Sequence, residues 1–385
     1  MTYNPTSFRI IWKIHKNRYD FFSIFADMNK ILPFFAVLLM VLGACDSRGT
    51  RTLFVGTYSD GFYAFDFDPE KGEVIPADGE YGSVAKAPVP NPSFLAASGS
   101  RIYAVSELPG RNAAVTAWHY TGNGFESLGD QPTGLPEGGE DPCYVSTDGR
   151  FLAVANYSGG SLSVYRLQAD GGIAPLDSLV FSTTGGPDLS RQDRPHVHCV
   201  LFTPDHKLLF TEFSADAIGA LDVTPMGVGN ERRLAMLPAD FGPRHLLLEG
   251  NRLYCIGELS GDIAVYSYPD MALLQVARAD EVGARGAADI HLSPDGAFLY
   301  ASLRLQNDGV SLFKVLPDGT LEKTGYTHTG THPRNFTVLE KWVLVACRDT
   351  DQVEIYSRDP KTGVLQDTGR RIEVPKPVFV SDFSR

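Results

Sequence analysis

Ionisable side chains recur at the edges of short apolar runs along this chain of 385 residues. One set begins an apolar run and consists of His196, His198, Arg244, His245, Asp289, His291 and Arg334. A second set ends such a run and consists of Tyr58, Glu107, Asn156, Glu212, Glu258, Arg304 and Arg348. A buried charge costs free energy unless it is paired, so these residues form either a structural ion-pair network or a binding pocket. Spacing alone leaves both alternatives open.

The residue types narrow this choice. The planar guanidinium of arginine suits a carboxylate or a phosphate, and histidine titrates near neutral pH. Glu258 or Glu212 has the chemistry to act as a base or to orient a histidine. We therefore expect a site that binds a small anion and moves a proton. The arginines of the two sets oppose a bound cation, so we expect no metal. We expect no other cofactor.

A repeat of about 45 to 50 residues positions these side chains. Its anchors are prolines before short apolar runs, or an alanine pair where proline is absent: Pro92, Pro142, Pro195, Pro243, Ala287-Ala288, Pro333 and Pro377. The unit after Pro142 is the clearest, with three strand-like runs separated by turns. Its first turn contains Asp148-Gly149, which is typical of a tight hairpin.

Four-stranded units at this period predict the blades of a β-propeller. Residues 52–82 supply the later strands of a blade without its first strand, and the segment after Pro377 supplies only a first strand. The two ends together complete one blade, which closes a ring of seven and removes an exposed sheet edge. We therefore predict an all-β protein: a seven-bladed propeller of four-stranded antiparallel blades, with residues 52–385 as a single domain.

This topology gathers the polar residues at one place. In an antiparallel pair the start of the first strand lies beside the end of the second. Both sets of residues then face one rim of the propeller, and the first strands line its central channel. The pattern predicts one pocket at the channel mouth.

Overall composition excludes some partners. The formal net charge is −12, which argues against binding to nucleic acid. Four cysteines lie inside apolar runs and are expected to be buried thiols: Cys143, Cys199, Cys255 and Cys347. We expect a monomer.

The N-terminal residues have the pattern of an export signal. Lys30 precedes an apolar run from Ile31 to Leu42, and small residues follow it up to Cys45. Leu42-Gly43-Ala44-Cys45 resembles a bacterial lipobox, which implies cleavage before Cys45 and a lipid on its sulfur. We therefore expect residues 1–44 to be an extension plus signal peptide and residues 45–51 to be a short tether. The location expected is the cell envelope, with a lipid anchor as the only membrane contact.

Five motifs in order at blade spacing carry a family resemblance. They are Pro195-His196-Val197-His198 with Pro204-Asp205, Gly242-Pro243-Arg244-His245, Glu258-Leu259, Ala288-Asp289-Ile290-His291 with Ser293-Pro294-Asp295-Gly296, and His332-Pro333-Arg334-Asn335. The chain resembles the seven-bladed lactonases, which include propeller-type 6-phosphogluconolactonases and the fungal muconate cycloisomerase. The resemblance implies a catalytic cluster at His198, Arg244, Glu258 and Arg304. We expect the substrate to be bound by Asn156, His196, His245, Asp289, His291 and Arg334.

The function expected from these residues is hydrolysis of a sugar lactone, with an anionic or sugar-lactone substrate. His198 would act as general base and an arginine would stabilise the oxyanion. Two alternatives stay open. One is a muconate-type cycloisomerase that uses the same cluster, and the other is a non-catalytic propeller that binds a carbohydrate or a partner.

Overall fold

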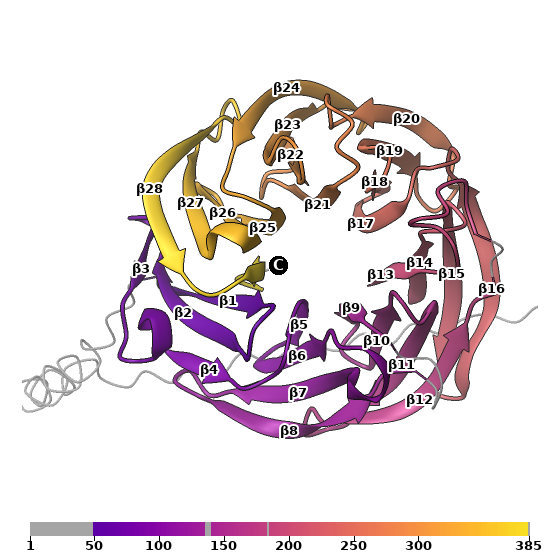
Figure 1. The fold of residues 1–385 in the computed structure, drawn as a ribbon, viewed down its shortest axis with the longest axis horizontal. Helices are drawn as coiled ribbons and strands as arrows, with labels where there is room; N and C mark the ends of the chain where they lie inside the picture. The colour runs from indigo at the N-terminus through magenta and orange to yellow at the C-terminus, as the bar shows by residue number, and fades with distance from the viewer. Residues whose placement is uncertain (1–48, 135–139, 183–184, 384–385) are drawn as a thin grey trace, which may run out of the picture. The chain divides into compact units, whose positions relative to one another are not determined.

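The propeller is formed by strands that gather into seven antiparallel sheets around a central axis (Figure 1). The computed structural model describes residues 49–134, 140–182 and 185–383. The predicted signal peptide, and the part of the predicted tether up to residue 48, lie outside the described residues. The predicted all-β, seven-bladed architecture is confirmed, and in the described part of the chain the only helices are short 3-10 turns.

Six blades take their four strands from one continuous stretch of chain. The first three of them are β5 Leu95–Ser98, β6 Arg101–Ser106, β7 Ala114–Tyr120 and β8 Phe125–Pro132; β9 Pro142–Thr147, β10 Phe151–Asn156, β11 Ser161–Leu167 and β12 Ile173–Val180; and β13 Val197–Phe202, β14 Lys207–Glu212, β15 Ala217–Thr224 and β16 Gly227–Met236. The next three are β17 Pro243–Glu249, β18 Arg252–Gly257, β19 Asp262–Ser267 and β20 Leu273–Arg278; β21 Ala287–Leu292, β22 Phe298–Leu303, β23 Gly309–Val315 and β24 Leu321–His328; and β25 Pro333–Val338, β26 Trp342–Cys347, β27 Gln352–Arg358 and β28 Leu365–Glu373.

The seventh blade joins the two ends of the propeller. The C-terminal strand β29 (Pro377–Ser381) pairs with β1 (Arg51–Thr57), which pairs with β2 (Phe62–Asp68). The outer strand of this blade is split into β3 (Glu73–Ile75) and β4 (Ala85–Ala87), both paired with β2. Pro76 follows β3 directly, and its lack of a backbone N–H ends that pairing. Pairing of the two ends confirms the predicted closure.

The innermost strand of each blade faces the centre of the ring, and β29 is the innermost strand of the blade that joins the two ends (Figure 1). The predicted antiparallel register is present in five blades, through the pairs Pro142↔Asn156, Val197↔Glu212, Pro243↔Gly257, Ala287↔Leu303 and Pro333↔Cys347. Each of these pairs joins the start of a first strand to the end of a second strand. The polar residues of both sets are therefore brought to one rim.

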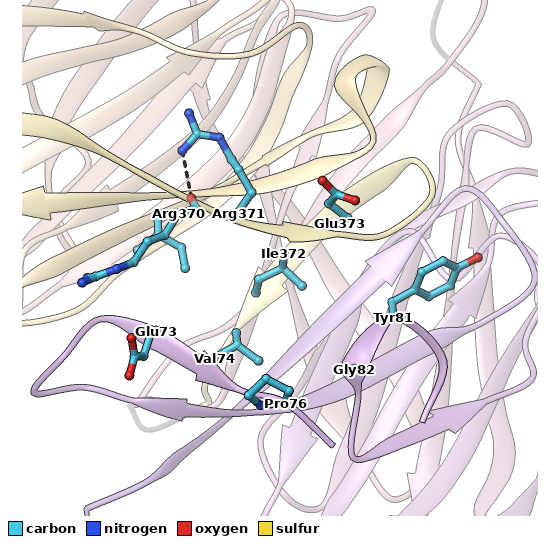
Figure 2. Close-up of a pocket in the computed structure, with 10 residues that line it drawn as sticks. Glu73, Val74, Pro76, Tyr81, Gly82, Arg370, Arg371, Ile372 and Glu373 are labelled. Carbon is cyan, nitrogen blue, oxygen red and sulfur yellow. Dashed lines mark hydrogen bonds between the residues drawn. The ribbon is translucent and has the colours of Figure 1, made fainter. Parts of the chain in front are cut away.

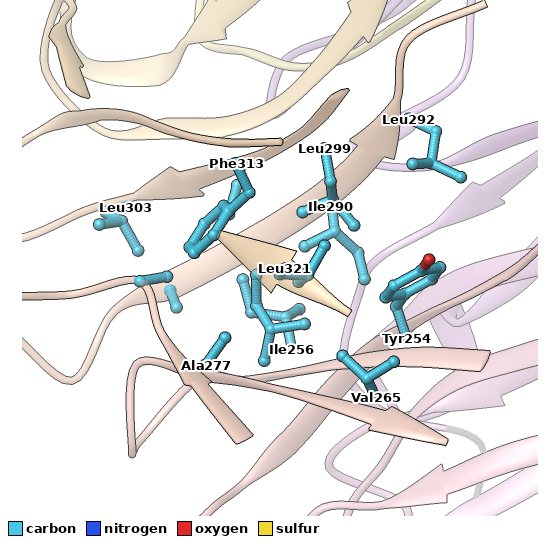
Figure 3. Packing of buried hydrophobic residues seen from close by; sticks show 14 residues of the cluster. Tyr254, Ile256, Val265, Ala277, Ile290, Leu292, Leu299, Leu303, Phe313 and Leu321 are labelled. Atoms are coloured by element: carbon cyan, nitrogen blue, oxygen red, sulfur yellow. The ribbon is translucent and has the colours of Figure 1, made fainter. Parts of the chain in front are cut away.

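Apolar side chains fill the space between neighbouring blades. Figure 3 shows one such cluster, between the β17–β20 blade and the β21–β24 blade. It includes Ile256 and Ile263 of one blade and Leu299 and Phe313 of the next, all at most 1% exposed. Burying each such side chain stabilises the fold by about 1.5–3 kcal/mol. The rim residues are thus held by a rigid scaffold.

The four cysteines are free and buried, as expected. Within the described residues, no helix is long and apolar enough to cross a membrane.

Candidate active site in the central channel

The channel-lining residues lie at local irregularities of the first strands. The regular pairing shifts between Val197 and Cys199, between Pro243 and Leu246, and between Ala287 and Ile290. A similar shift follows Pro333. A β-bulge leaves the extra residue outside the ladder and changes the direction of its side chain. The residues at these shifts are His198, Arg244, His245, Ala288, Asp289 and Arg334, so the bulges select the channel-facing set.

Glu258 is the centre of this set. It follows β18, and its backbone N–H donates to the carbonyl of Gly242 at 2.8 Å. Its carboxylate contacts three guanidinium groups: Nε of Arg244 at 2.8 Å, Nη2 of Arg304 at 3.2 Å and Nη2 of Arg191 at 2.6 Å. Burial alone would raise the pKa of Glu258, but these arginines outweigh it and hold the pKa well below its usual range. Glu258 is therefore ionised at neutral pH.

His198 lies beside Glu258 as a neutral base. Its Nε2 is 4.0 Å from a carboxylate oxygen of Glu258, which is too long for a direct hydrogen bond. Burial and the charge of Arg244 hold the pKa of His198 well below 6.5. The imidazole consequently carries no charge at neutral pH and is able to accept a proton.

A second carboxylate, Asp289, binds three side chains. It accepts hydrogen bonds from Nδ1 of His245 at 2.7 Å, from Nε2 of His291 at 2.9 Å and from the amide of Asn335 at 2.5 Å. Burial would raise the pKa of Asp289, but the two histidines lower it overall, so Asp289 is ionised. Nε2 of His245 lies 3.0 Å from a guanidinium nitrogen of Arg244, which fixes it as an acceptor. His245 therefore links the two carboxylate centres.

Arg304 contacts His332, a histidine to which the sequence analysis assigned no role in the site. Its Nε donates to the carbonyl of Gly286 at 2.8 Å, and its Nη1 lies 3.4 Å from Nε2 of His332. Burial lowers the pKa of Arg304 to about 9. Burial and the charge of Arg304 lower the pKa of His332 to about 3. His332 directly precedes the anchor Pro333, which is the sequence signal that could have identified it.

Arg334 contacts a third carboxylate, Glu107. Its guanidinium lies 5.2 Å from the centre of the Tyr58 ring and 3.7 Å from a carboxylate oxygen of Glu107. The hydroxyl of Tyr58 donates to the other oxygen of Glu107 at 2.7 Å. Tyr58 and Glu107 end second strands in the sequence repeat, but no role was assigned to them.

Two predicted substrate ligands are held by other residues of the protein, Asn156 within its own blade and His196 by a residue of the neighbouring blade. The amide of Asn156 donates to the hydroxyls of Ser161 and Ser163 at 3.0 and 3.1 Å, and Asn156 is completely buried. His196 stacks on Tyr157 with ring centres 4.3 Å apart. Their contact with a substrate stays a prediction.

Arg191 is the contact of Glu258 that the sequence interpretation missed. It comes from the long connection between β12 and β13, outside the strand register that identified the other residues. Nothing in the spacing of the repeat singles it out. Its place on Glu258 is a tertiary contact across 67 residues.

The channel narrows around these side chains. A crevice lined by Ser93, Phe94, Cys143, Arg244, His245, Arg334, Asn335 and Val378 has no room for a water molecule, so the predicted substrate pocket at the channel mouth stays a prediction. The described residues contain no group of three or more His, Cys, Asp or Glu side chains arranged to hold a metal ion.

A larger hollow lies at the outer edge, where the first and last blades meet (Figure 2). It is lined by residues of β3 and β28, including Glu73 and Arg371. Arg371 is already paired, with Asp367 at 2.8 Å and Glu354 at 3.3 Å. None of the predicted site residues lines this hollow.

The geometry defines a class of protein: a closed propeller whose channel mouth holds ionised carboxylates, buried arginines and neutral histidines. Residues 52–381 match the family described as lactonase, 7-bladed beta-propeller. The chain belongs to this lactonase family.

Relatives agree with this assignment. A 6-phosphogluconolactonase of Formosa agariphila is 31% identical over 344 residues, covering 82% of this chain and 94% of that protein. The crystal structure of a putative 6-phosphogluconolactonase from Bacteroides fragilis has a TM-score of 0.80 and 38% identity, covering 88% of this chain and 99% of that chain. The structure of the periplasmic gluconolactonase of Pseudomonas aeruginosa has a TM-score of 0.75 and 28% identity, and the match covers 86% of this chain and 98% of that chain.

Proposed function

We propose that this lactonase hydrolyses a sugar lactone that carries an anionic group, and that the reaction takes place at the cluster around Glu258. The observation that carries this proposal is a neutral, buried His198 next to a carboxylate that three arginines keep ionised. A base and a positive field are the two requirements of lactone opening.

The guanidinium groups make the electrostatic field positive at three buried histidines. Positive charge contributes to the lowered pKa of His198, His245 and His332. Burial is the largest cause of these shifts and disfavours any charge, whereas the positive charge of the arginines favours an anion. An anionic substrate and an anionic transition state are both stabilised there.

In the proposed mechanism, His198 takes a proton from a water molecule as its oxygen attacks the lactone carbonyl carbon. The field of Arg244 and Arg304 stabilises the negative charge that develops on the carbonyl oxygen. The ring C–O bond then breaks, and the departing alkoxide takes up the proton from His198. Glu258 stays ionised throughout and stabilises the imidazolium that forms 4.0 Å away.

The test is hydrolysis of 6-phosphogluconolactone by the purified protein, corrected for the spontaneous reaction. Removing the base with His198→Gln is expected to lower kcat by about 10²- to 10⁴-fold. His206→Gln is the matched control, since His206 is exposed on a turn. A His198→Gln protein that is folded and as active as the control would contradict the proposed role of His198.

We also propose that Cys45 is lipidated and that the propeller is anchored in the cell envelope. The support is the lipobox-like sequence up to Cys45 and a relative described as a periplasmic gluconolactonase. Cells that express the protein with a lipobox-processing machinery should incorporate labelled palmitate into it, and Cys45→Ser should abolish the label. Equal labelling of both proteins would overturn this proposal.

A further inference from the structure

A short segment between β12 and β13 carries Arg191 to the channel. We call residues 185–192 the strap. The strap closes on itself, because the N–H of Gly186 donates to the carbonyl of Gln192 at 2.8 Å. A Cβ at Gly186 would lie 2.4 Å from the side-chain oxygen of Gln192 and 2.7 Å from the backbone carbonyl oxygen of Ser214, so the turn has no room for a larger residue. The strap is thus a tightly built element.

Gln192 fixes the strap to the neighbouring blade. Its side chain is completely buried and donates to the carbonyl of Phe213 at 2.9 Å and to the carboxylate of Asp216 at 3.0 Å. Buried side-chain amides with satisfied hydrogen bonds hold their surroundings in one geometry. Arg191 precedes this anchor directly.

Arg285 holds the other end of the strap. It contacts Asp188 of the strap at 2.6 Å and donates to both carboxylate oxygens of Asp240 at 2.7 Å. Arg285 lies in the connection before β21, and Asp240 lies in the connection before β17. One guanidinium therefore ties together three loops of the channel rim.

The guanidinium of Arg191 differs from the other two groups on Glu258. Arg244 is 1% exposed, and the side chain of Arg304 is 5% exposed, whereas that of Arg191 is 36% exposed. The nitrogens of Arg304 also bind the carbonyls of Gly286 and Ala287. Arg191 is the solvent-facing member of the three.

The described hydrogen bonds of the Arg191 guanidinium all leave from one nitrogen, Nη2, toward Glu258 and the hydroxyl of Tyr157. The central carbon of the guanidinium lies over the ring of Phe213, at 5.4 Å from the ring centre. An arginine has five N–H donors in a fixed plane. The contacts with Glu258 and Phe213 hold the guanidinium in place, and among the described residues no hydrogen-bond partner is found for Nε and Nη1.

We infer that Arg191 binds the anionic group of the substrate, a phosphate or a carboxylate, and that the strap thereby sets the preference for charged over neutral lactones. This inference rests on the proposed function. A planar guanidinium forms paired hydrogen bonds with either anion, and its charge makes these bonds stronger than neutral ones. Arg285 is a positioning residue, because it holds the strap without reaching the substrate.

The test compares kcat/KM for 6-phosphogluconolactone, for a glucaric acid lactone and for neutral gluconolactone. Arg191→Gln is expected to reduce the preference for the charged lactones over gluconolactone by roughly 10- to 100-fold, the range for a charge-assisted hydrogen bond. A reduced preference for 6-phosphogluconolactone identifies a phosphate as the bound anion, a reduced preference for the glucaric acid lactone identifies a carboxylate, and a reduction with both shows that Arg191 binds either group. Arg285→Gln should reduce the same ratio to a smaller extent, and Arg150→Gln, on an exposed turn, should leave it unchanged.

An unchanged ratio in folded Arg191→Gln would overturn the inference even if the protein is an active lactonase. Calorimetric titration with the product, 6-phosphogluconate, provides a second readout that does not need catalysis. Wild-type binding that weakens at least about 10-fold in Arg191→Gln supports the inference even if no lactone is hydrolysed. Equal binding by both proteins, or no binding by the wild type, overturns it.

Discussion

At the scale of residues, two carboxylates organise the channel, and each of them contacts arginine or histidine side chains. Glu258 binds Arg191, Arg244 and Arg304, whereas Asp289 binds His245 and His291. Buried charges of this kind are costly unless every member is paired. The network therefore fixes which histidines are neutral, and the neutral ones are the candidates for proton transfer.

His332 provides a test of this electrostatic account. Its pKa in the folded protein is about 3, below the usual 6.5, so the unfolded chain binds a proton between these values and the folded protein does not. The stability that neutral His332 contributes to the folded protein is fully present above pH 6.5 and is lost as the pH falls toward 3. His332→Asn, which tolerates the positive φ of 63° at this position, should lose less stability than the wild type between pH 7 and pH 5.

The measurement is the melting temperature across that pH range, with an expected difference of about 3 °C between the two declines. His206→Gln serves as the control, because this exposed histidine lies on a surface turn. Parallel declines for wild type and His332→Asn would show that His332 is not held neutral.

At the scale of elements, turns and bulges aim the side chains that the strands carry. Gly242 shows the requirement most clearly. Its φ is +60°, and a Cβ there would lie 2.6 Å from Leu259 and 3.0 Å from Phe213. Its carbonyl also accepts the backbone N–H of Glu258. This glycine therefore sets the position of both Arg244 and Glu258.

Gly242→Ala is expected to lower the free energy of unfolding by about 2–5 kcal/mol, from the left-handed backbone and from overpacking. Gly250→Ala is the matched control, since Gly250 has a φ of +55° but no atom within 4 Å of the added Cβ. The control isolates the backbone cost of about 1–2 kcal/mol. If chemical denaturation showed the same loss in the free energy of unfolding for Gly242→Ala and Gly250→Ala, close packing at Gly242 would be unimportant.

The limits of sequence interpretation also follow from the elements. The repeat predicted the strand ends, and through them the convergence of His198, Arg244, Glu258 and Arg304. Arg191 was missed because it lies between blades, where no register applies and only the fold of the strap decides its place. The bulges and the split outer strand of the first blade were not predicted, since each depends on local backbone geometry that an apolar pattern does not encode.

At the scale of the whole molecule, closure of the ring depends on β29. Val380 pairs with Val55 and is 1% exposed, in a cluster with residues of the first and last blades. Without this strand, β1 would be an unpaired edge. The repeat period fixed the number of blades, because two partial units at the ends supplied one complete blade.

Val380→Ala should therefore destabilise the protein by about 2 kcal/mol and lower its melting temperature by several degrees, because it leaves a cavity where β29 packs between the first and last blades. Val364→Ala is the control, since Val364 is 53% exposed. If neither Val380→Ala nor Val364→Ala changed the melting temperature, the packing of β29 between the first and last blades would not contribute to stability.

The central claim is that the cluster around Glu258 opens an anionic sugar lactone. The most direct measurement is kcat/KM for 6-phosphogluconolactone at pH 7, corrected for spontaneous hydrolysis, with Glu258→Gln and the exposed Glu249→Gln as a matched pair. We expect at least about 10⁴ M⁻¹s⁻¹ for the wild type and for Glu249→Gln. Folded Glu258→Gln should be roughly 100-fold slower, because the imidazolium loses its counter-charge. Activity unchanged by Glu258→Gln, or no acceleration by the wild type, would contradict the account.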